Sequence, residues 1–390
     1  MEKIYFDHAA TTAVRPEVLN AMLPFFTERY GNPSSIYEIA RNNKKALETA
    51  REKTAAAINA GPAEVFFTGG GTESDNWAIR GIAEPRGETG GHIITTAIEH
   101  HAVLHTCQYL EKKGFSVTYL PVDSDGIINM RDLENALRPD TFLITIMTAN
   151  NEIGSIQPIA EIGALARSKK ILFHTDAVQA AGQIPIDVKA QNIDMLSMSA
   201  HKFYGPKGVG TLYVRKGVPL KPFMFGGAQE SNRRAGTENI PGIVGLGTAL
   251  ELAVSEMGAE SVRQAGLRDR LIGGILSSVQ HVRLNGSRTK RLPNNVNVSF
   301  EFIEGESMLL LLDMKGIFAS SGSACTSGSL DPSHVLLAIG LPHEKAHGSL
   351  RLTLGRDTTN EQIDYFLKEL PPIIGRLRDM SPLYEEYLKK

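Results

Sequence analysis

Short apolar runs alternate with helical stretches through the first 215 residues, and this alternation constrains the fold more than any other feature. Seven runs rich in β-branched and apolar residues are strand candidates: 65–68, 92–98, 116–122, 142–148, 171–175, 195–199 and 210–215. Most are continuous, as in strands buried on both faces. Helical stretches separate many of them, at 39–59, 72–83, 101–113 and 159–168. The pattern predicts an α/β domain with a mainly parallel seven-stranded sheet between two layers of helices.

The rhythm changes after residue 215. Apolar residues fall at helical spacing up to Met257, and a second long helical stretch reaches about residue 280. A strand candidate at 296–300 and a helix at 306–314 follow. We expect a large domain over 14–257 and a smaller α+β domain formed by 1–13 and 258–390. The smaller domain would carry the loop 319–332.

Composition narrows the function classes. Hydrophobic residues make up 42% and the formal net charge is −2, with no basic stripe of the kind that nucleic-acid binding requires. The longest apolar runs, such as 309–312, are too short to span a bilayer, and the N-terminus has no apolar signal core. The sequence therefore predicts a soluble, cytoplasmic protein that binds neither nucleic acid nor membrane.

Lys202 follows a predicted strand and precedes a glycine-rich turn. A lysine at the end of a strand, among apolar residues, can have a lowered pKa and serve as a Schiff-base amine. Ser199 and His201 beside it could hydrogen-bond a phosphate. A surface turn with a solvated lysine is an equally good interpretation of this stretch alone.

Three glycines, 69–71, and Thr72 stand between a strand and a helix. Glycines let the backbone approach an anion, and a helix N-terminus offers free amides and positive dipole. The alternative is a flexible turn with Thr72 as a plain N-cap. The stretch is neither a dinucleotide fingerprint nor a Walker loop.

Asp176 and His100 each follow a predicted strand. Asp176 would hold a cofactor's pyridine nitrogen protonated, or else cap the next helix. The imidazole of His100 could stack on an aromatic cofactor. Metal binding by His101 and His105, at i and i+4, is a rival hypothesis, but no third ligand lies nearby in the sequence. We therefore predict no metal.

The two cysteines differ in their surroundings. Cys107 shares a helical face with Val103 and Leu110, which is typical of a small core residue. Cys325 lies among serines, glycines and alanine, where a thiol has little packing value and reactivity explains it better. Arg351 and Arg356 fall in a strand-like stretch, and a guanidinium there could hold a substrate carboxylate or form a surface ion pair.

In this order the motifs resemble the cysteine desulfurases of the NifS/IscS type, within the class V aminotransferase-like group of pyridoxal-phosphate enzymes. The resemblance covers essentially the whole chain. The most specific pieces are Glu99-His100, Asn150-Asn151-Glu152-Ile153-Gly154, His201-Lys202, Arg234-Ala235-Gly236-Thr237-Glu238-Asn239 and Ser321-Gly322-Ser323-Ala324-Cys325. It implies the pyridoxal-phosphate-dependent transferase fold of type I. One departure lies at 225–234, where the family more often has a further glycine at Ala228.

The resemblance also implies roles for individual residues. Lys202 would bind the cofactor covalently and move protons, His100 would stack on the ring, and Cys325 would be the nucleophile. The remaining cofactor contacts would come from Gly71, Thr72, Asn151, Asp176, Gln179, Ser199, His201 and, from a second subunit, Thr237. Asn151 and Arg351 would hold the substrate carboxylate.

The implied reaction converts L-cysteine to L-alanine and leaves a persulfide on Cys325. A class V aminotransferase or a selenocysteine lyase is the alternative enzyme, and a sulfur-scaffold or regulatory homologue is the non-enzyme alternative. The implied partners are a second copy of the chain and an iron–sulfur scaffold as sulfur acceptor, with tRNA-thiolation proteins as another route.

Overall fold

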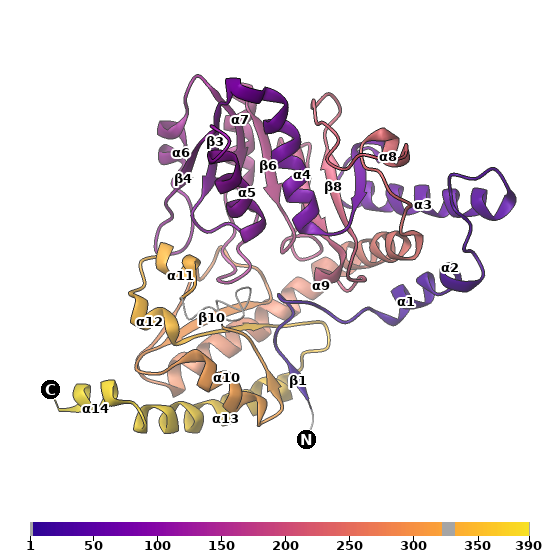
Figure 1. Cartoon of the computed structure of the whole chain (residues 1–390). Helices are drawn as coiled ribbons and strands as arrows, with labels where there is room; N and C mark the ends of the chain where they lie inside the picture. Colours follow the sequence, from indigo (N-terminus) through magenta and orange to yellow (C-terminus); the bar gives the residue numbers. More distant parts are fainter. Residues whose placement is uncertain (1–2, 322–331, 390) are drawn as a thin grey trace.

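The computed structural model describes residues 3–321 and 332–389, and its centre is a seven-stranded sheet (Figure 1). In spatial order the strands are β2 (Val65–Thr68), β8 (Gly210–Val214), β7 (Met195–Ser199), β6 (Leu172–Asp176), β5 (Thr141–Thr145), β3 (His92–Thr96) and β4 (Ser116–Leu120). The pairs from β4 to β7 are parallel, and β8 runs antiparallel to both of its neighbours. Each predicted strand overlaps one of these, so the mainly parallel seven-stranded sheet is confirmed.

Consecutive side chains of the central strands enter two different hydrophobic cores. Ile93 packs into the core on one face and Ile94 into the core on the other, and Met195 and Leu196 divide in the same way. Because side chains alternate across a strand, burial of both faces requires a continuous apolar run. The edge strand β4 differs, since its first residue, Ser116, is exposed.

Helices cover both faces of this sheet (Figure 1). One face carries α4 (Gly71–Ala83) and α5 (His101–Glu111), whose buried side chains include Cys107, as predicted. The other face carries α3 (Glu38–Ala57), α7 (Ile159–Lys169) and the start of α9 (Ile240–Ser278). The remaining elements of this part are α1 (Pro16–Met22), α2 (Pro24–Thr27), α6 (Met130–Ala136), α8 (Gln229–Asn232), η1 (Pro62–Glu64), η2 (Glu84–Thr89) and η3 (Ala200–Lys202).

The apolar side chains on the two faces of the large sheet together make up a first core, and a second, separate core lies below it in Figure 1. Its sheet has the order β12 (Ser349–Thr353), β10 (Asn295–Phe300) and β9 (Val282–Leu284), and β1 (Ile4–Tyr5) pairs with β11 (Ile317–Phe318). The helices are α10 (Gly305–Asp313), α11 (His334–Ala338), α12 (His343–His347), α13 (Asn360–Asp379) and α14 (Pro382–Leu388). The strand and helix predicted near residues 296–314 are thereby confirmed. The domain boundaries at 13/14 and 257/258 stay predictions.

Helix α9 joins the two cores. The sequence predicts a long connecting helix between the two domains and indicates two helical stretches in this region; the connecting helix is confirmed, and the two stretches are parts of one continuous helix of 39 residues. Ile243 and Leu246 pack into the first core, and Leu271 and Ile275 pack into the second. Gly258 stands between the two apolar stretches, but it keeps a helical backbone and no proline follows it, so the helix continues through the partly exposed stretch between them.

Within the described part of the chain, α9 is also the one helix that is long and apolar enough, by length and composition, to cross a membrane. Helix α9 is not an unbroken apolar run in the sequence, because glycines and charged residues are spread along it. In the structure its apolar residues contribute to both cores. The core helix of a soluble protein can have the same length and apolar composition as a membrane-spanning helix.

The segment that departs from the family pattern has an unusual backbone. Glu230, Ser231 and Asn232 all have positive φ, a conformation that favours glycine. A buried ion pair holds the segment in place. The Glu230 carboxylate accepts bonds from Arg51 at 2.7 and 2.8 Å and from the Phe67 amide at 2.9 Å.

We predict that Glu230→Ala lowers the free energy of unfolding by about 3–5 kcal/mol, because it leaves the buried Arg51 guanidinium without its partner. Urea denaturation of the cofactor-free protein would measure the change. The matched control is Glu48→Ala, which removes the exposed partner of the same arginine and should cost under about 1 kcal/mol. Equal losses in the two variants would contradict the prediction.

Candidate active site

A cavity of about 280 Å³ lies at the carboxyl edge of the central sheet. Ligands of open α/β sheets bind in this position, where loops diverge from the strand ends. Ten of the predicted site residues line it together: Gly71, Thr72, His100, Asn151, Asp176, Gln179, Ser199, His201, Lys202 and Arg351. A larger groove of about 780 Å³ beside α12 and α14 contains none of them.

One wall of the cavity is the N-terminus of α4. Gly70 is the N-cap, with φ of 152°, and a Cβ on Gly71 would lie 2.7 Å from a methyl group of Val178. These glycines therefore bring bare backbone amides to the cavity wall, where an anion can bind them. Thr72 is not the N-cap that the alternative interpretation suggested. Ser199, at the end of β7, and His201 face the same wall.

Asp176 ends β6 and is almost completely buried. One carboxylate oxygen accepts a bond from the Val178 amide at 2.8 Å, so Asp176 also caps the turn that follows. Burial raises the pKa of Asp176 to about 6, against the opposing effects of the Val178 amide and the Lys202 charge. A cation placed against this carboxylate would restore its charged form.

Lys202 lies in η3, immediately after β7. Its Nζ donates to the Ala9 carbonyl at 2.5 Å and to the Ala10 carbonyl at 2.8 Å. Gln179 donates to the same Ala9 carbonyl at 3.0 Å. The N-terminal segment therefore closes the cavity above the lysine, a contribution that the sequence motifs do not reveal.

His100 is the N-cap of α5, and its Nδ1 accepts a bond from the Ala102 amide at 3.1 Å. Burial, aided by the charge of Lys202, lowers the pKa of the His100 ring, so the ring is neutral near pH 7. The preceding residue, Glu99, is buried below it and accepts bonds from the Met147 amide and from Thr96. These contacts hold the imidazole rigidly at the cavity wall.

Arg351 reaches the cavity from β12 of the smaller core. Its guanidinium donates to Asp7 at 2.9 Å and to the Asn151 carbonyl at 3.1 Å, while Nε is buried without a partner among the described residues. A buried unpaired donor facing a cavity is suited to a carboxylate. Arg356 does not line the cavity, so the structure distinguishes two arginines that the sequence left equivalent.

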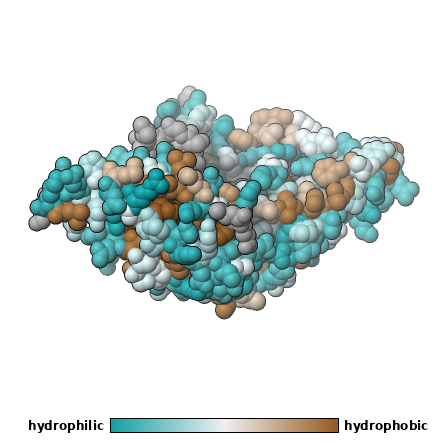
Figure 2. All heavy atoms as spheres, turned by 90° about the horizontal axis from the view of Figure 1, so that it is seen from below, coloured by the Kyte–Doolittle hydropathy of each residue, from teal (hydrophilic) through white to brown (hydrophobic). Residues whose placement is uncertain are grey.

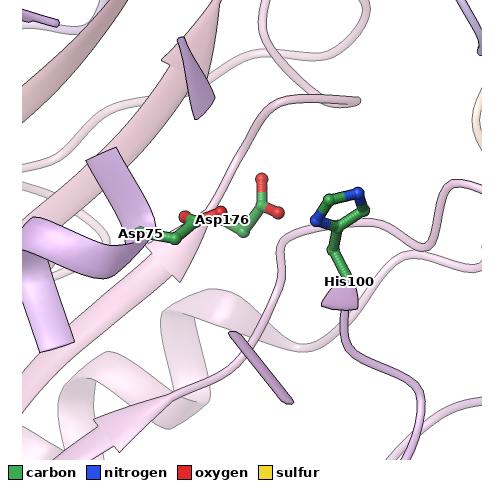
Figure 3. Close-up of side chains that lie close together, drawn as sticks. All are labelled: Asp75, His100 and Asp176. Atoms are coloured by element: carbon green, nitrogen blue, oxygen red, sulfur yellow. The ribbon is translucent and has the colours of Figure 1, made fainter. Parts of the chain in front are cut away.

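Asp75 is a cavity residue that the sequence interpretation missed. It lies three residues after Thr72 in α4, and residues at this spacing share a helical face. That spacing is the signal that could have found it. A carboxylate oxygen of Asp75, a carboxylate oxygen of Asp176 and a ring nitrogen of His100 lie within 4.8 Å of one another (Figure 3). Among the described residues, this is the one place where three acidic, histidine or cysteine side chains approach so closely.

The two remaining predicted residues do not line the cavity. Thr237 is exposed, although the neighbouring Arg234 bonds Glu73 of α4 at 2.8 and 3.0 Å. Cys325 lies outside the described residues. The chain on either side of 322–331 is nevertheless attached beside the cavity: Ser320 pairs with Arg351, and Ser333 donates to Glu152 at 2.5 Å.

Comparisons with known proteins agree with this geometry. A family model described as aminotransferase class-V matches residues 4–366. "Cysteine desulfurase IscS" of Clostridium botulinum is 59% identical over 390 residues, covering 100% of this chain and 98% of that one. A solved "NIFS-LIKE PROTEIN" is 42% identical with a TM-score of 0.91, covering 96% of this chain and 100% of its own. "SspA in complex with cysteine" is 42% identical with a TM-score of 0.81, covering 90% and 99%.

The chain therefore belongs to the class V aminotransferase family of pyridoxal-phosphate enzymes, with their fold of type I. Within that family it is one of the NifS/IscS-type cysteine desulfurases. The resemblance inferred from the motifs is confirmed. The roles of the individual site residues stay predictions.

Glu99 generates a prediction about pH. Burial raises its pKa from 4.5 to about 8, so the folded protein binds more protons than the unfolded chain between these values. Wild-type stability should therefore fall as pH rises through that window. Glu99→Gln removes this titration, and its stability relative to wild type should rise on the order of 1–3 kcal/mol between about pH 5 and pH 9.

Urea denaturation at both pH values would measure this difference. Glu134→Gln, an exposed matched control on α6, should show no such rise relative to wild type. A difference between Glu99→Gln and wild type that stays the same at both pH values would disprove the assignment.

Proposed function

We propose that this chain is a pyridoxal-phosphate-dependent cysteine desulfurase, which converts L-cysteine to L-alanine and takes the sulfur as a persulfide on Cys325. The observation that carries the proposal is the meeting of three features in one cavity. These are an amine on Lys202, a buried carboxylate on Asp176 and an anion-binding helix terminus at Gly71. A chain 59% identical is named "Cysteine desulfurase IscS".

The residues present fit pyridoxal 5′-phosphate. The phosphate would lie against the amides of α4 at Gly71 and Thr72, with Ser199 and His201 beside it. Asp176 would face the ring nitrogen, Gln179 the ring oxygen and His100 the ring face, with Asn151 nearby. When bound, this cofactor supplies an electron sink for the negative charge left on the substrate's α-carbon.

Substrate binding would use the unpaired donor of Arg351. A carboxylate at its Nε would complete the guanidinium's hydrogen bonds and relieve a buried unsatisfied N–H. Asn151, whose carbonyl already orients Arg351, would bind the same carboxylate with its side chain. This contact places the α-carbon of the amino acid toward Lys202.

Proton movements would fall to Lys202 and His100. Once the substrate amine takes the place of Lys202, the released amine of Lys202 can take the α-proton and return a proton to the α-carbon at the end of the reaction, while the proton gained by the β-carbon balances the one that the Cys325 thiol loses. The imidazole of His100 is neutral and can accept a proton, and because burial lowers its pKa the ring gives that proton up again readily. Asp176 would stay an anion throughout, because the opposing cation balances its charge.

Sulfur transfer would use the thiolate of Cys325. The thiolate attacks the substrate sulfur, an S–S bond forms and the Cβ–S bond breaks, and the β-carbon takes a proton. The substrate carbon is reduced while the Cys325 sulfur is oxidised, so L-cysteine and one thiol yield L-alanine and one persulfide. The attachment of Ser320 and Ser333 beside the cavity supports this assignment.

The active protein would be a homodimer in which Thr237 contacts the phosphate of the neighbouring subunit. Thr237 is exposed in this chain, while Arg234 ties its segment to the α4 terminus. Large apolar side chains are exposed nearby in sequence and along the segment from α1 to α3, including Phe225 at 89% and Ile36, between α2 and α3, at 88%. A second copy with two-fold symmetry would cover them.

Hydrophobic atoms are mixed with hydrophilic ones on the face seen in Figure 2, and they extend toward the side where Figure 1 draws α1 and α2.

We also propose a location for the protein and an acceptor for its sulfur. The protein would be cytoplasmic and would pass sulfur to an iron–sulfur scaffold, with tRNA-thiolation proteins as a second acceptor. Copurification from the native cell would identify the acceptor.

We predict that Cys325→Ser abolishes sulfide release from L-cysteine in the presence of dithiothreitol, because no thiol remains to accept the sulfur. The variant should still bind the cofactor and show a change in visible absorbance with L-cysteine. Cys107→Ala, the matched control at the buried cysteine, should keep sulfide release. Full sulfide release by Cys325→Ser would refute the assignment, and pyruvate as the main wild-type product would point to an aminotransferase.

Thr237→Ala should weaken cofactor retention roughly 10-fold, as expected for loss of a hydrogen bond to a charged group. Because a contact made across the interface links cofactor binding to dimerisation, dilution should release cofactor and separate the subunits together. Absorbance-detected sedimentation would follow both. Thr289→Ala, an exposed control, should behave as wild type. A fully active, cofactor-loaded wild-type monomer would rule the proposal out.

A further inference from the structure

Two carboxyl groups meet on the floor of the cavity. Asp75 extends from α4 and Asp176 from the end of β6, and each has an oxygen within 4.8 Å of the other (Figure 3). The mechanism proposed above uses Asp176 and gives Asp75 no role. Asp75 is 1% exposed, and a carboxyl group buried so completely needs a physical reason.

The surroundings of Asp75 supply no positive charge to balance a carboxylate. Its Oδ1 is buried without a hydrogen-bond partner among the described residues. The nearest basic atom is Nε2 of His174, 3.7 Å away. Both nitrogens of that ring are occupied, by Thr145 at 2.8 Å and Ser197 at 3.0 Å, and burial lowers the pKa of His174 to about 3. The ring is therefore neutral.

Asp176 is better suited to carry charge. It accepts the Val178 amide bond, and the charge of Lys202 lowers its pKa against the effect of burial. For Asp75, burial raises the pKa most, followed by the charges of Asp176 and Glu99, while Ser197 opposes the shift. Two buried carboxyl groups this close share a proton. The difference between their surroundings favours the anion on Asp176 and the proton on Asp75.

We infer that Asp75 is a proton store for the cofactor site: it holds one proton while the site lacks the cofactor and gives that proton up when the ring nitrogen becomes protonated against Asp176. This inference rests on the proposed function only in taking pyridoxal 5′-phosphate as the cofactor. One O–H bond breaks at Asp75 and one N–H bond forms on the ring. A neutral carboxyl group and a neutral ring nitrogen become a carboxylate and a cation.

Electrostatics gives the reason for the release. The negative charge of Asp176 holds the proton on Asp75, and a cation placed against Asp176 cancels that repulsion. The groups that face the pair are His100, His174, Glu99 and Lys202, and none of them supplies a positive charge next to Asp75. The ring cation is therefore the charge that allows both carboxyl groups to ionise. Asp75 is a positioning residue, since it sets the charge at Asp176.

The test counts protons. Apo wild type and apo Asp75→Asn would be titrated with pyridoxal 5′-phosphate near neutral pH, by calorimetry in buffers of different ionisation enthalpy. Asp75→Asn should take up about one proton more per subunit than wild type, because its site stores none. Asp132→Asn, a matched exposed control on α6, should match wild type.

Equal proton uptake by wild type and Asp75→Asn would overturn the inference while leaving the proposed function intact. Failure of wild type to bind pyridoxal 5′-phosphate would overturn both. Infrared difference spectroscopy of the wild type decides the question even if the variant folds poorly. The carbonyl band of one protonated carboxyl group should be lost from the wild type when the cofactor binds, beside any band of Glu99 that persists, and a difference spectrum with no such loss would contradict the inference.

Discussion

Helix α9 holds the two hydrophobic cores in one fixed relation, and the cavity depends on that relation because its walls come from both. Lys202 and Asp176 belong to the large sheet, whereas Arg351 lies on a strand of the smaller one. A continuous helix packed into both cores resists bending between them, since bending would separate buried side chains on either side. The geometry between the lysine and the arginine is thus a consequence of core packing.

The second constraint on the site is the burial of its carboxyl groups, because burial disfavours their charged forms. The carboxyl groups of Asp75, Asp176, Glu99 and Glu152 all have pKa values raised by desolvation, so each resists ionisation. Such a concentration of unfavourable groups costs folding free energy and is typical of functional sites. A cationic ring nitrogen placed against Asp176 would offset part of this cost. Binding and folding are therefore linked at the same residues.

One irregular segment near the cavity is held in place by side-chain contacts. Three consecutive residues after Gln229 adopt positive φ, yet the segment is held by the buried pair of Arg51 and Glu230. Arg234 then ties the segment to Glu73 at the start of α4. Side-chain contacts here replace the backbone hydrogen bonds of regular structure. They fix the segment next to the start of α4, and Thr237, three residues after Arg234, is exposed.

The sequence by itself determined the sheet and the chemistry at its edge. Continuous apolar runs require strands buried on both faces, and polar residues directly after such runs, Asp176 and Lys202 among them, must lie at one edge of a parallel sheet. Only the tertiary structure decided which distant residues complete the site. Asp75 beside Asp176, the Ala9 carbonyl against Lys202, and Arg351 rather than Arg356 all depend on how separate elements pack. Local patterns encode which face of an element is buried but carry no information about which other element covers it, and for this reason α9 also looked like two helices.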